Sequence, residues 1–262
     1  MEHNYPSDIT SEQFEVVRED LENLKMTTRP RENDLYDIFC ALLYLVRNGI
    51  QWRSLPSDFP KWQTVYYYYS QWKILGEDGN SLFDGILKKL TSLIRASEER
   101  KEEPSLGIVD SKSIRNAHTA RDKGYDAGKK ISGMKIHVAV DVLGLPICVY
   151  ATTADITDRN GALAMASANK KDFASVLNVL FDGAYSGEKF AIAFQKVTGC
   201  NVRVVKRSEL HKFAVIPKRW VVERSFSWLD KCHRLWRNCE RTIRNTCQMT
   251  VLAFIALLIM RF

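Results

Sequence analysis

The chain of 262 residues is long enough to bury a large core, and its apolar (45%) and charged (26%) fractions are those of an ordinary globular protein. No internal repeat or low-complexity tract is present, which excludes repeat and fibrous architectures. The net charge of +7 is unevenly distributed: residues 1–100 carry 12 Lys/Arg against 16 Asp/Glu, and the rest carries 26 against 15. Basic charge concentrated in one part indicates a polyanionic partner such as nucleic acid, although a solvated basic face remains the alternative.

The cysteines indicate a reducing compartment. No C-x-x-C pair and no His at zinc spacing accompanies them, so we expect free thiols and a cytoplasmic protein. The first four residues are polar and lack the apolar stretch of a signal peptide. The C-terminal apolar run at 249–260 spans about 12 residues, short of the ~20 needed to cross a bilayer, so we expect a buried closing helix and no membrane partner.

The first hundred residues predict a small helical unit. Residues 9–14 combine a hydroxyl cap with an acidic first turn, which is typical of a helix start. Residues 34–48 have an amphipathic helical stripe that ends at Gly49, and residues 63–75 and 82–94 predict two more helices. A helix, a Pro-containing turn and a second helix are compatible with a helix-turn-helix DNA-binding unit. A helical bundle that binds nothing remains the alternative.

A domain boundary is predicted at residues 98–104, which are charged and end in proline. This linker separates a helical module at 1–97 from a larger domain at 105–262. Within the larger domain the expected order is three strands, a helix, a strand, a helix, a strand and two final helices. The first of these final helices runs from Pro217 to about Arg241. The order predicts an α/β fold with a mixed sheet and helices on both of its faces.

Three acids stand out from this pattern. Asp110 follows the apolar run at 106–109, Asp182 follows the apolar run at 176–181, and Glu223 lies in a helix-patterned, otherwise basic segment. Taken singly, an Asp at a strand end is more often a turn former, and a Glu in a basic helix is usually an ion-pair partner. Found together in this element order, the three acids can converge at one edge of the sheet. The order therefore predicts a catalytic centre formed by Asp110, Asp182 and Glu223.

The chemistry of these acids fits divalent metal ions. Hard Mg²⁺ or Mn²⁺ takes oxygen ligands and keeps several waters, so three carboxylates are an adequate protein contribution. Two such ions can stabilise the attacking and leaving oxygens of an in-line phosphoryl displacement. We therefore expect Mg²⁺ (or Mn²⁺) as the cofactor and a phosphodiester as the substrate.

Basic residues surround the predicted centre and are expected to contact DNA phosphates. Residues 218–244 carry eight Lys/Arg, and a glycine-rich cationic segment at 121–135 could follow a phosphate backbone or form a solvated hairpin tip. The expected DNA-binding residues are Arg219, Arg224, Lys231, Arg234, Lys129, Lys130, Lys135, Trp52 and Arg53.

Several of these segments resemble a known family. The stretches Val109-Asp110-Ser111-Lys112-Ser113, Phe181-Asp182-Gly183-Ala184-Tyr185 and Arg219-Trp220-Val221-Val222-Glu223-Arg224 resemble the three acid motifs of DDE-type insertion-sequence transposases, most like the insertion sequence 5 family. The stretch Gly49-Ile50-Gln51-Trp52-Arg53 resembles the small DNA-binding module of that family. The resemblance covers nearly the whole chain.

The resemblance implies a ribonuclease H-like catalytic domain, magnesium dependence and cut-and-rejoin chemistry at terminal inverted repeats. It also implies double-stranded DNA as the partner, both as transposon ends and as target, and a homodimer or higher assembly on DNA. Two other functions remain open: a nuclease of the same fold without strand transfer, and a catalytically inactive, sequence-specific DNA-binding regulator.

Overall fold

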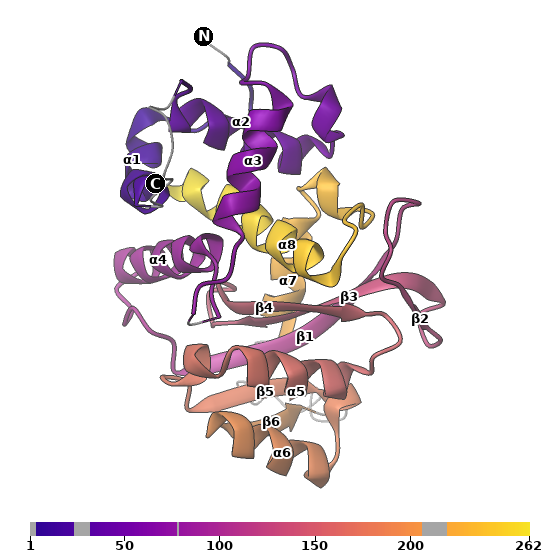
Figure 1. Cartoon of the computed structure of the whole chain (residues 1–262). Helices are drawn as coiled ribbons and strands as arrows, with labels where there is room; N and C mark the ends of the chain where they lie inside the picture. The colour runs from indigo at the N-terminus through magenta and orange to yellow at the C-terminus, as the bar shows by residue number, and fades with distance from the viewer. Residues whose placement is uncertain (1–3, 24–31, 78, 206–218) are drawn as a thin grey trace.

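The computed structural model describes residues 4–23, 32–77, 79–205 and 219–262. Helices come first, and a mixed sheet with further helices follows (Figure 1). The first group is α1 (Ser11–Glu22), α2 (Leu35–Asn48), η1 (Trp52–Ser54, a 3-10 turn), α3 (Trp62–Trp72) and α4 (Leu82–Ser97). The strands are β1 (Leu106–Arg115), β2 (Gly124–Asp126), β3 (Ile131–Val140), β4 (Pro146–Thr153), β5 (Asn178–Asp182) and β6 (Asn201–Val205). The remaining helices are α5 (Asp158–Ala168), η2 (Lys170–Phe173), η3 (Gly183–Tyr185), α6 (Glu188–Thr198), α7 (Arg219–Leu229), η5 (His233–Leu235), α8 (Ile243–Leu258) and η6 (Ile259–Arg261).

The N-terminal helices begin and end at the residues that their sequences favour. Thr10 caps α1 in a reciprocal capping box with Gln13, and the Asp34 side chain accepts from the backbone at the start of α2. Gly49 ends α2 in the left-handed conformation, with φ at 69°, which favours glycine. These helix starts and the predicted stop at Gly49 are therefore confirmed.

The sheet is mixed. β1 pairs antiparallel with β3, which pairs antiparallel with β4 and with the short β2, so the three strands expected first in the larger domain form an antiparallel meander. On its other side β1 pairs parallel with β5, and β5 pairs parallel with β6. The strand order is β2-β3-β1-β5-β6, with β4 beside β3, so β1 is central. The segment expected to be a cationic loop contains β2 and is part of a hairpin with β3.

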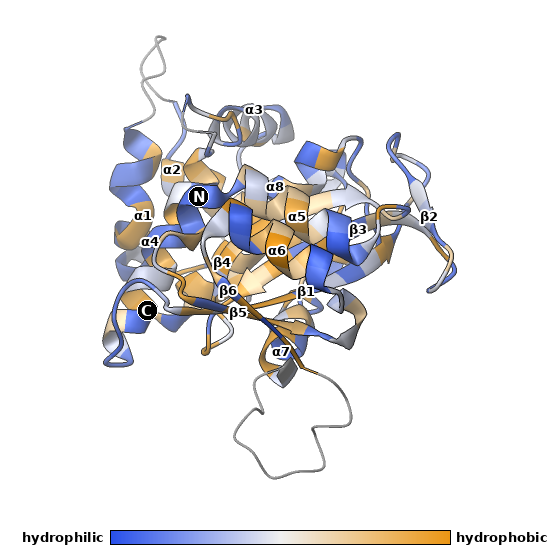
Figure 2. Ribbon diagram, turned by 90° about the horizontal axis from the view of Figure 1, so that it is seen from below, coloured by the Kyte–Doolittle hydropathy of each residue, from blue (hydrophilic) through white to orange (hydrophobic). Residues whose placement is uncertain are grey.

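The two faces of the sheet bury separate apolar clusters. Val109, Val179 and Phe181 face α5 and α6, which lie side by side over one face (Figure 2). Ile108 and Leu180 belong to the other cluster, which also contains apolar residues of α7 and α8. Because successive residues of a strand point to opposite faces, this assignment gives the direction of every other residue on β1 and β5.

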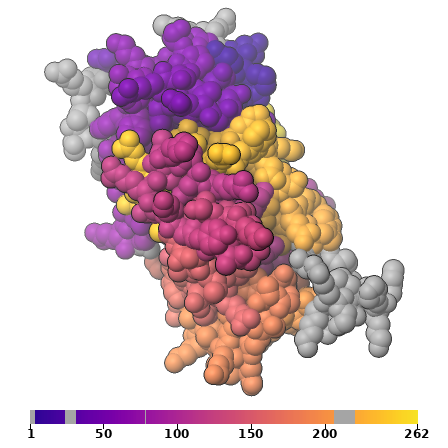
Figure 3. All heavy atoms as spheres, turned by 90° about the vertical axis from the view of Figure 1, so that its right-hand side faces the viewer, coloured from indigo at the N-terminus to yellow at the C-terminus, as the bar shows by residue number. Residues whose placement is uncertain are grey.

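The helix α8 lies between the N-terminal helices and the sheet. It packs against α2, α4, α7 and β4, and one apolar cluster extends from α1 through α8 to the sheet. In the space-filling view the C-terminal residues, orange to yellow, lie between the indigo and purple N-terminal helices and the rest of the protein (Figure 3). The proposed boundary at residues 98–104 therefore divides the sequence, but the hydrophobic core extends across it.

The long helix predicted to reach Arg241 ends at Leu229, so this prediction is wrong. Its proposed start at Pro217 lies outside the described residues. Beyond Leu229 the chain forms η5 and then runs beside the end of β1, where Asn238 bridges to Asn116 and donates its backbone N–H to the carbonyl oxygen of Arg115 at 2.9 Å. This tertiary pairing outweighs the local helix propensity of the segment.

The closing helix is longer than the 12 residues expected. Among the described residues one helical stretch, Ile243–Arg261, would be long and apolar enough to cross a membrane by length and composition alone. Two thirds of its most apolar window (67%) is buried inside the protein, as in the core helix of a globular protein. The expectation of a buried helix is confirmed.

Candidate active site

Asp110 and Asp182 lie on adjacent parallel strands at the same level. The register pairs Leu106 with Asn178 and Ile108 with Leu180, so continuing it by two residues places Asp110 beside Asp182. Neighbouring strands are about 4.8 Å apart. Each aspartate therefore lies two residues beyond the last residue that pairs β1 with β5, near the point where β5 ends.

Both aspartates point to the α7 face of the sheet. Asp110 shares its face with Ile108, and Asp182 shares its face with Leu180; both apolar residues pack into the cluster that contains α7. Each carboxylate also accepts a local backbone N–H: that of Ser111 for Asp110 at 2.8 Å, and that of Ala184 for Asp182 at 2.9 Å. Both side chains are half-buried, so they are ordered by the protein but reachable from outside.

The charges of both aspartates affect the pKa of Tyr185. Burial is the main cause that raises the pKa of Tyr185 well above its usual range, and the negative charge of Asp110 raises it further. A smaller contribution comes from Asp182. Both carboxylates therefore lie within electrostatic range of a single hydroxyl group, which agrees with their adjacent positions on β1 and β5.

Glu223 lies on the exposed side of α7. This helix packs on β1, β3 and β5 through Val222, Phe226 and Leu229, and Glu223 is exposed. Two turns further along the same exposed side, the Asp230 carboxylate pairs with Lys112 at 2.5 Å. Lys112 is on the same face of β1 as Asp110, so the exposed side of α7 borders the part of β1 that carries the aspartate.

A turn between β3 and β4 holds α7 in place. The Arg224 guanidinium donates to the carbonyl oxygen of Leu143 at 2.8 Å, and the Ser225 hydroxyl donates to that of Gly144 at 2.8 Å. Arg224 also stacks on Trp220 and Trp228, with its guanidinium carbon 4.6 Å and 5.1 Å from the ring centroids. Arg224 and Ser225 follow Glu223 directly, so this turn holds α7 beside Glu223.

A buried polar network lies on the opposite face of β1. Lys135 pairs with Asp126 at 3.3 Å and with Asp158 at 2.9 Å. The Ser111 and Ser113 hydroxyls donate to the same two carboxylates, at 2.8 Å to Asp158 and 2.7 Å to Asp126. Burial opposes ionisation of Asp126, but the Ser113 hydrogen bond, the Lys129 backbone amide and the Lys135 charge lower its pKa to about 2. Ser111 follows Asp110 directly, so the network supports β1 behind the aspartates.

The expected DNA-binding residues differ in their exposure. Lys135 and Arg234 are buried, and their charges are compensated by acids: Arg234 pairs with Glu240 at 2.8 Å. These two cations stabilise the interior of the protein. Their contact with phosphate is disfavoured, because each would first have to break its ion pair with a buried acid. Arg224 is half-buried against the β3–β4 turn, and Trp52 packs against Tyr66 and Tyr69. The side chains of Lys129, Lys130, Lys231 and Arg53 are exposed, whereas that of Arg219, the first residue of α7, lies outside the described part.

The donor chemistry of the three acids suits a hard divalent cation, because carboxylate oxygens are the ligands that Mg²⁺ and Mn²⁺ prefer. Asp110 and Asp182 are adjacent and share a face, and Glu223 is on the helix packed over that face. Across the described ranges, no group of three His, Cys, Asp or Glu side chains is already placed to hold an ion. Asp110 and Asp182 therefore suit such a site by their strands and shared face, and Glu223 suits it by donor type and by the helix that carries it.

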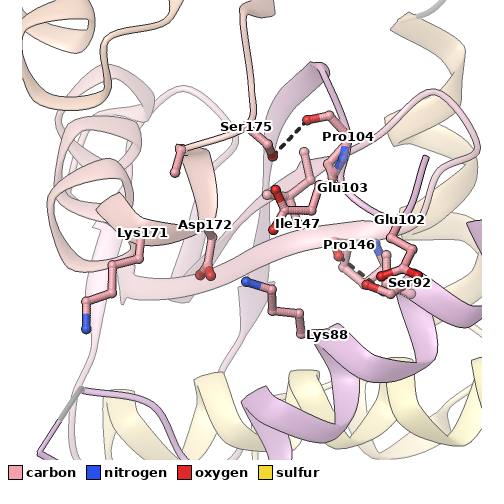
Figure 4. Close-up of a pocket in the computed structure, with 12 residues that line it drawn as sticks. Lys88, Ser92, Glu102, Glu103, Pro104, Pro146, Ile147, Lys171, Asp172 and Ser175 are labelled. Atoms are coloured by element: carbon pink, nitrogen blue, oxygen red, sulfur yellow. Dashed lines mark hydrogen bonds between the residues drawn. The ribbon is translucent and has the colours of Figure 1, made fainter.

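The pocket drawn in Figure 4 lies elsewhere. It is lined by Lys88 of α4, Pro146 and Ile147 of β4, and Asp172 of η2, and contains none of the three acids. Lys88 and Asp172 point toward one another across it (Figure 4). The pocket marks the junction between α4 and the sheet.

The mixed sheet, with Asp110 within β1, Asp182 at the end of β5 and an acid-bearing helix over the same face, agrees with the DDE class of protein. Comparison with family models agrees: the chain matches "Transposase DDE domain" over residues 101–259 and "Putative transposase of IS4/5 family" over residues 9–77. The first match covers more than half of the chain, so this protein belongs to the DDE transposase family. The comparisons with curated proteins and with solved structures gave no match.

The sequence analysis missed the importance of the turn at residues 141–145. Asp141 is fully buried and accepts the backbone N–H groups of Leu143 and Leu145, at 2.8 Å and 2.9 Å. Gly144 has φ at 81°, and an added Cβ would lie 2.9 Å from the Ser225 hydroxyl oxygen. An Asp three residues before a Gly at a predicted turn was the available signal.

Proposed function

We propose that this protein is a DNA transposase that cleaves DNA at terminal inverted repeats and joins the freed ends to target DNA. The observation that carries the proposal is the parallel register of β1 and β5, which ends at Ile108 and Leu180, two residues before Asp110 and Asp182 on the face covered by α7. The family of the chain supports it. The strand order, with an antiparallel meander followed by two parallel strands beside β1, supports the ribonuclease H-like fold that the resemblance implies.

In this proposal Asp110, Asp182 and Glu223 hold divalent magnesium or manganese. When bound, these ions would supply charge stabilisation at the attacking and leaving oxygens of the phosphodiester. The three carboxylates would bind the metal ions and orient them toward the phosphodiester. The backbone N–H groups of Ser111 and Ala184 donate to the two aspartates, and the β3–β4 turn holds α7, the helix that carries Glu223.

The reaction has two displacements at phosphorus. Water supplies the oxygen that bonds to the phosphorus in the first, and the 3′-oxygen of the transposon end leaves and takes up a proton. In the second, this 3′-hydroxyl bonds to a target phosphorus, a target 3′-oxygen leaves, and no external energy source is needed because one phosphodiester replaces another.

DNA would lie against exposed cations on two sides of the centre. Lys129 and Lys130 project from the β2–β3 hairpin, and Lys231 follows α7. Phosphate neutralisation by such side chains supplies most sequence-independent affinity. The N-terminal helices, with exposed Arg53 stacked near Trp62 at 5.7 Å, are the proposed element for recognising the repeat sequence. An assembly of at least two protomers would hold the paired ends.

A cleavage and strand-transfer assay tests this function. Purified protein is incubated with Mg²⁺ and labelled duplexes that carry the inverted repeats flanking its gene, together with a plasmid target. Nicking at the repeat end followed by joining to the plasmid is the expected result. Cleavage without joining would establish a nuclease, and specific binding without either reaction would establish a regulator.

A further inference from the structure

Two aromatic rings are displayed on the surface just beyond α7. The rings of His233 and Trp236 lie 4.2 Å apart between centroids, and Trp236 is 63% exposed. The indole Nε1 donates to the carbonyl oxygen of Asp230 at 2.7 Å, which fixes the orientation of the ring. A large aromatic side chain is thus held in place while most of its surface remains in water, an arrangement that folding alone does not favour.

The backbone under the pair is clamped to the end of α2. Gly49 approaches it so closely that an added Cβ would lie 2.9 Å from the carbonyl carbon of His233. The guanidinium of Arg234, between the two aromatics, donates to the carbonyl oxygen of Ile50 at 2.7 Å and pairs with Glu240. The rings are therefore preorganised, so a ligand that stacks on them would lose little conformational entropy in ordering them.

The pair is connected to the candidate active site. Asp230, which holds the Trp236 indole, also pairs with Lys112, two residues (about 7 Å) beyond Asp110 on the same face of β1. The segment after Trp236 bridges to Asn116, six residues (about 20 Å) beyond Asp110. The rings thus lie about two to six nucleotide steps from the aspartates, at about 3.4 Å a step.

We propose that His233 and Trp236 form a platform that stacks on an unpaired nucleobase of the DNA strand held at the candidate active site. The base belongs to a nucleotide about two to six positions from the cleaved phosphate. Aromatic rings stack on any base once it leaves the duplex stack, and the exposed cations Lys231 and Arg237 beside the rings suit the flanking phosphates. The predicted position of the base depends on the proposed transposase function, whereas the stacking itself does not.

The surroundings favour a nucleobase over a protein surface. The pair lies in a basic stretch of the chain, in which Lys231, Arg237 and Arg241 are exposed. Cationic side chains around a single fixed ring suit a polyanion that carries flat bases. A second copy of this basic chain would bring further positive charge to the same place.

The first experiment measures stacking without catalysis. Binding of the full-length protein to a 12-nucleotide single strand is followed by fluorescence anisotropy in EDTA, for the wild type and Trp236→Ala, Trp236→Phe and Leu177→Ala. Leu177 has the same exposed fraction, 63%, but precedes β5 at the opposite end from Asp182. Trp236→Ala is expected to weaken binding roughly 5- to 100-fold, Trp236→Phe by much less, and Leu177→Ala not at all. Equal binding by wild type and Trp236→Ala would overturn the platform.

The second experiment locates the base. Duplex repeat ends carry 5-iododeoxyuridine at single positions one to ten nucleotides from the end, and photo-cross-linked peptides are identified by mass spectrometry. Cross-linking of the peptide with Trp236 only at positions two to six is expected. Cross-links confined to other peptides, or a loss of self-association in Trp236→Ala with unchanged DNA binding, would overturn the proposal.

Measuring cleavage by the wild type separates a failure of the stacking platform from a failure of the proposed function. Normal cleavage with unchanged single-strand binding in Trp236→Ala would overturn only the platform. Weakened single-strand binding in Trp236→Ala, with no cleavage by the wild type, would support the platform and contradict the transposase.

Discussion

Arg95 of α4 and Asp141, directly after β3, form an ion pair that is almost completely buried. Arg95 also donates to the carbonyl oxygen of Lys101 at 2.8 Å, and Asp141 accepts two backbone N–H groups of its own turn. The same turn holds α7 through Arg224 and Ser225. The N-terminal helices and the helix that carries Glu223 are therefore joined through one short segment.

Removal of Arg95 should destabilise the whole protein. Arg95→Met leaves Asp141 charged and buried without its cation, which costs about 3–5 kcal/mol in the free energy of unfolding. The matched control is Lys89→Met, which removes a half-exposed pair with Asp20 and should cost less than about 1 kcal/mol. Urea unfolding measures both, and losses of equal size would contradict the role assigned to the buried pair.

Two helical glycines should respond in opposite directions to alanine. An added Cβ at Gly161 of α5 would lie 2.0 Å from the imidazole of His137, whereas Gly85 of α4 has open space around it. Gly85→Ala should stabilise the protein by roughly 0.5–1 kcal/mol through helix propensity. Gly161→Ala should destabilise it by about 1–3 kcal/mol through overpacking. Thermal unfolding distinguishes them, and stabilisation by Gly161→Ala would show that the helix and β3 are not in close contact.

His137 should make stability depend on pH. Burial lowers its pKa to about 4, with the Asp158 charge opposing this shift and those of Lys135 and Lys129 adding to it. Because the unfolded chain takes up a proton near pH 6.5 and the folded chain does not, stability falls as pH falls from about 6.5 to 4. The expected loss between pH 7.5 and pH 5 is about 2 kcal/mol.

Urea unfolding of the wild type and His137→Gln across this range tests the prediction. The variant should lose less stability on acidification, since its side chain cannot take up a proton. The carboxylates of the network, Asp126 and Asp158, have lowered pKa values and titrate below this window. Identical pH profiles for the two proteins would exclude His137 as the cause.

The β3–β4 turn should control catalysis as well as stability. Gly144→Ala adds a Cβ 2.9 Å from the Ser225 hydroxyl and 3.1 Å from Trp228, and should move α7. The control is Gly79→Ala. Gly79 has a similar positive φ, 85°, but an added Cβ would meet no atom within 4 Å, so this variant introduces the backbone strain without the steric clash. We expect Gly144→Ala to slow DNA cleavage about 10-fold or more, because small displacements of a catalytic group are costly. Equal cleavage rates in the two folded variants would show that the β3–β4 turn does not control catalysis through Glu223.

Much of the fold follows from local patterns. The caps at Thr10 and Asp34, the left-handed Gly49 and the alternation along β3 each depend on residues close in sequence, so they could be predicted. The end of α7 at Leu229 could not, because the segment beyond it makes contacts distant in sequence, such as the bridge between Asn238 and Asn116. The sharing of one core by α8 and the N-terminal helices likewise depends on contacts distant in sequence.

The candidate site was partly predictable for the same reason. The apolar runs before Asp110 and Asp182 predicted two strand ends, which is right for Asp182 at the end of β5 and wrong for Asp110, because β1 continues to Arg115. The parallel register, which ends two residues before both acids, could not be predicted from local sequence. The burial of Lys135 and Arg234 could not be seen in the sequence, because it depends on acids contributed by other segments: Asp126 and Asp158 for Lys135, and Glu240 for Arg234. A lysine in a basic stretch has the same local signature whether it is exposed or enclosed.

The most direct measurement is the rate of Mg²⁺-dependent cleavage of a repeat-end duplex by Asp110→Asn, Asp182→Asn and Glu223→Gln. The control is Glu188→Gln, an exposed carboxylate at the start of α6. Each of the three variants should cleave about 10³-fold more slowly or worse, while its affinity for the duplex remains within a few-fold of wild type. The control should cleave at the wild-type rate. Wild-type cleavage by any one of the three would contradict a shared site.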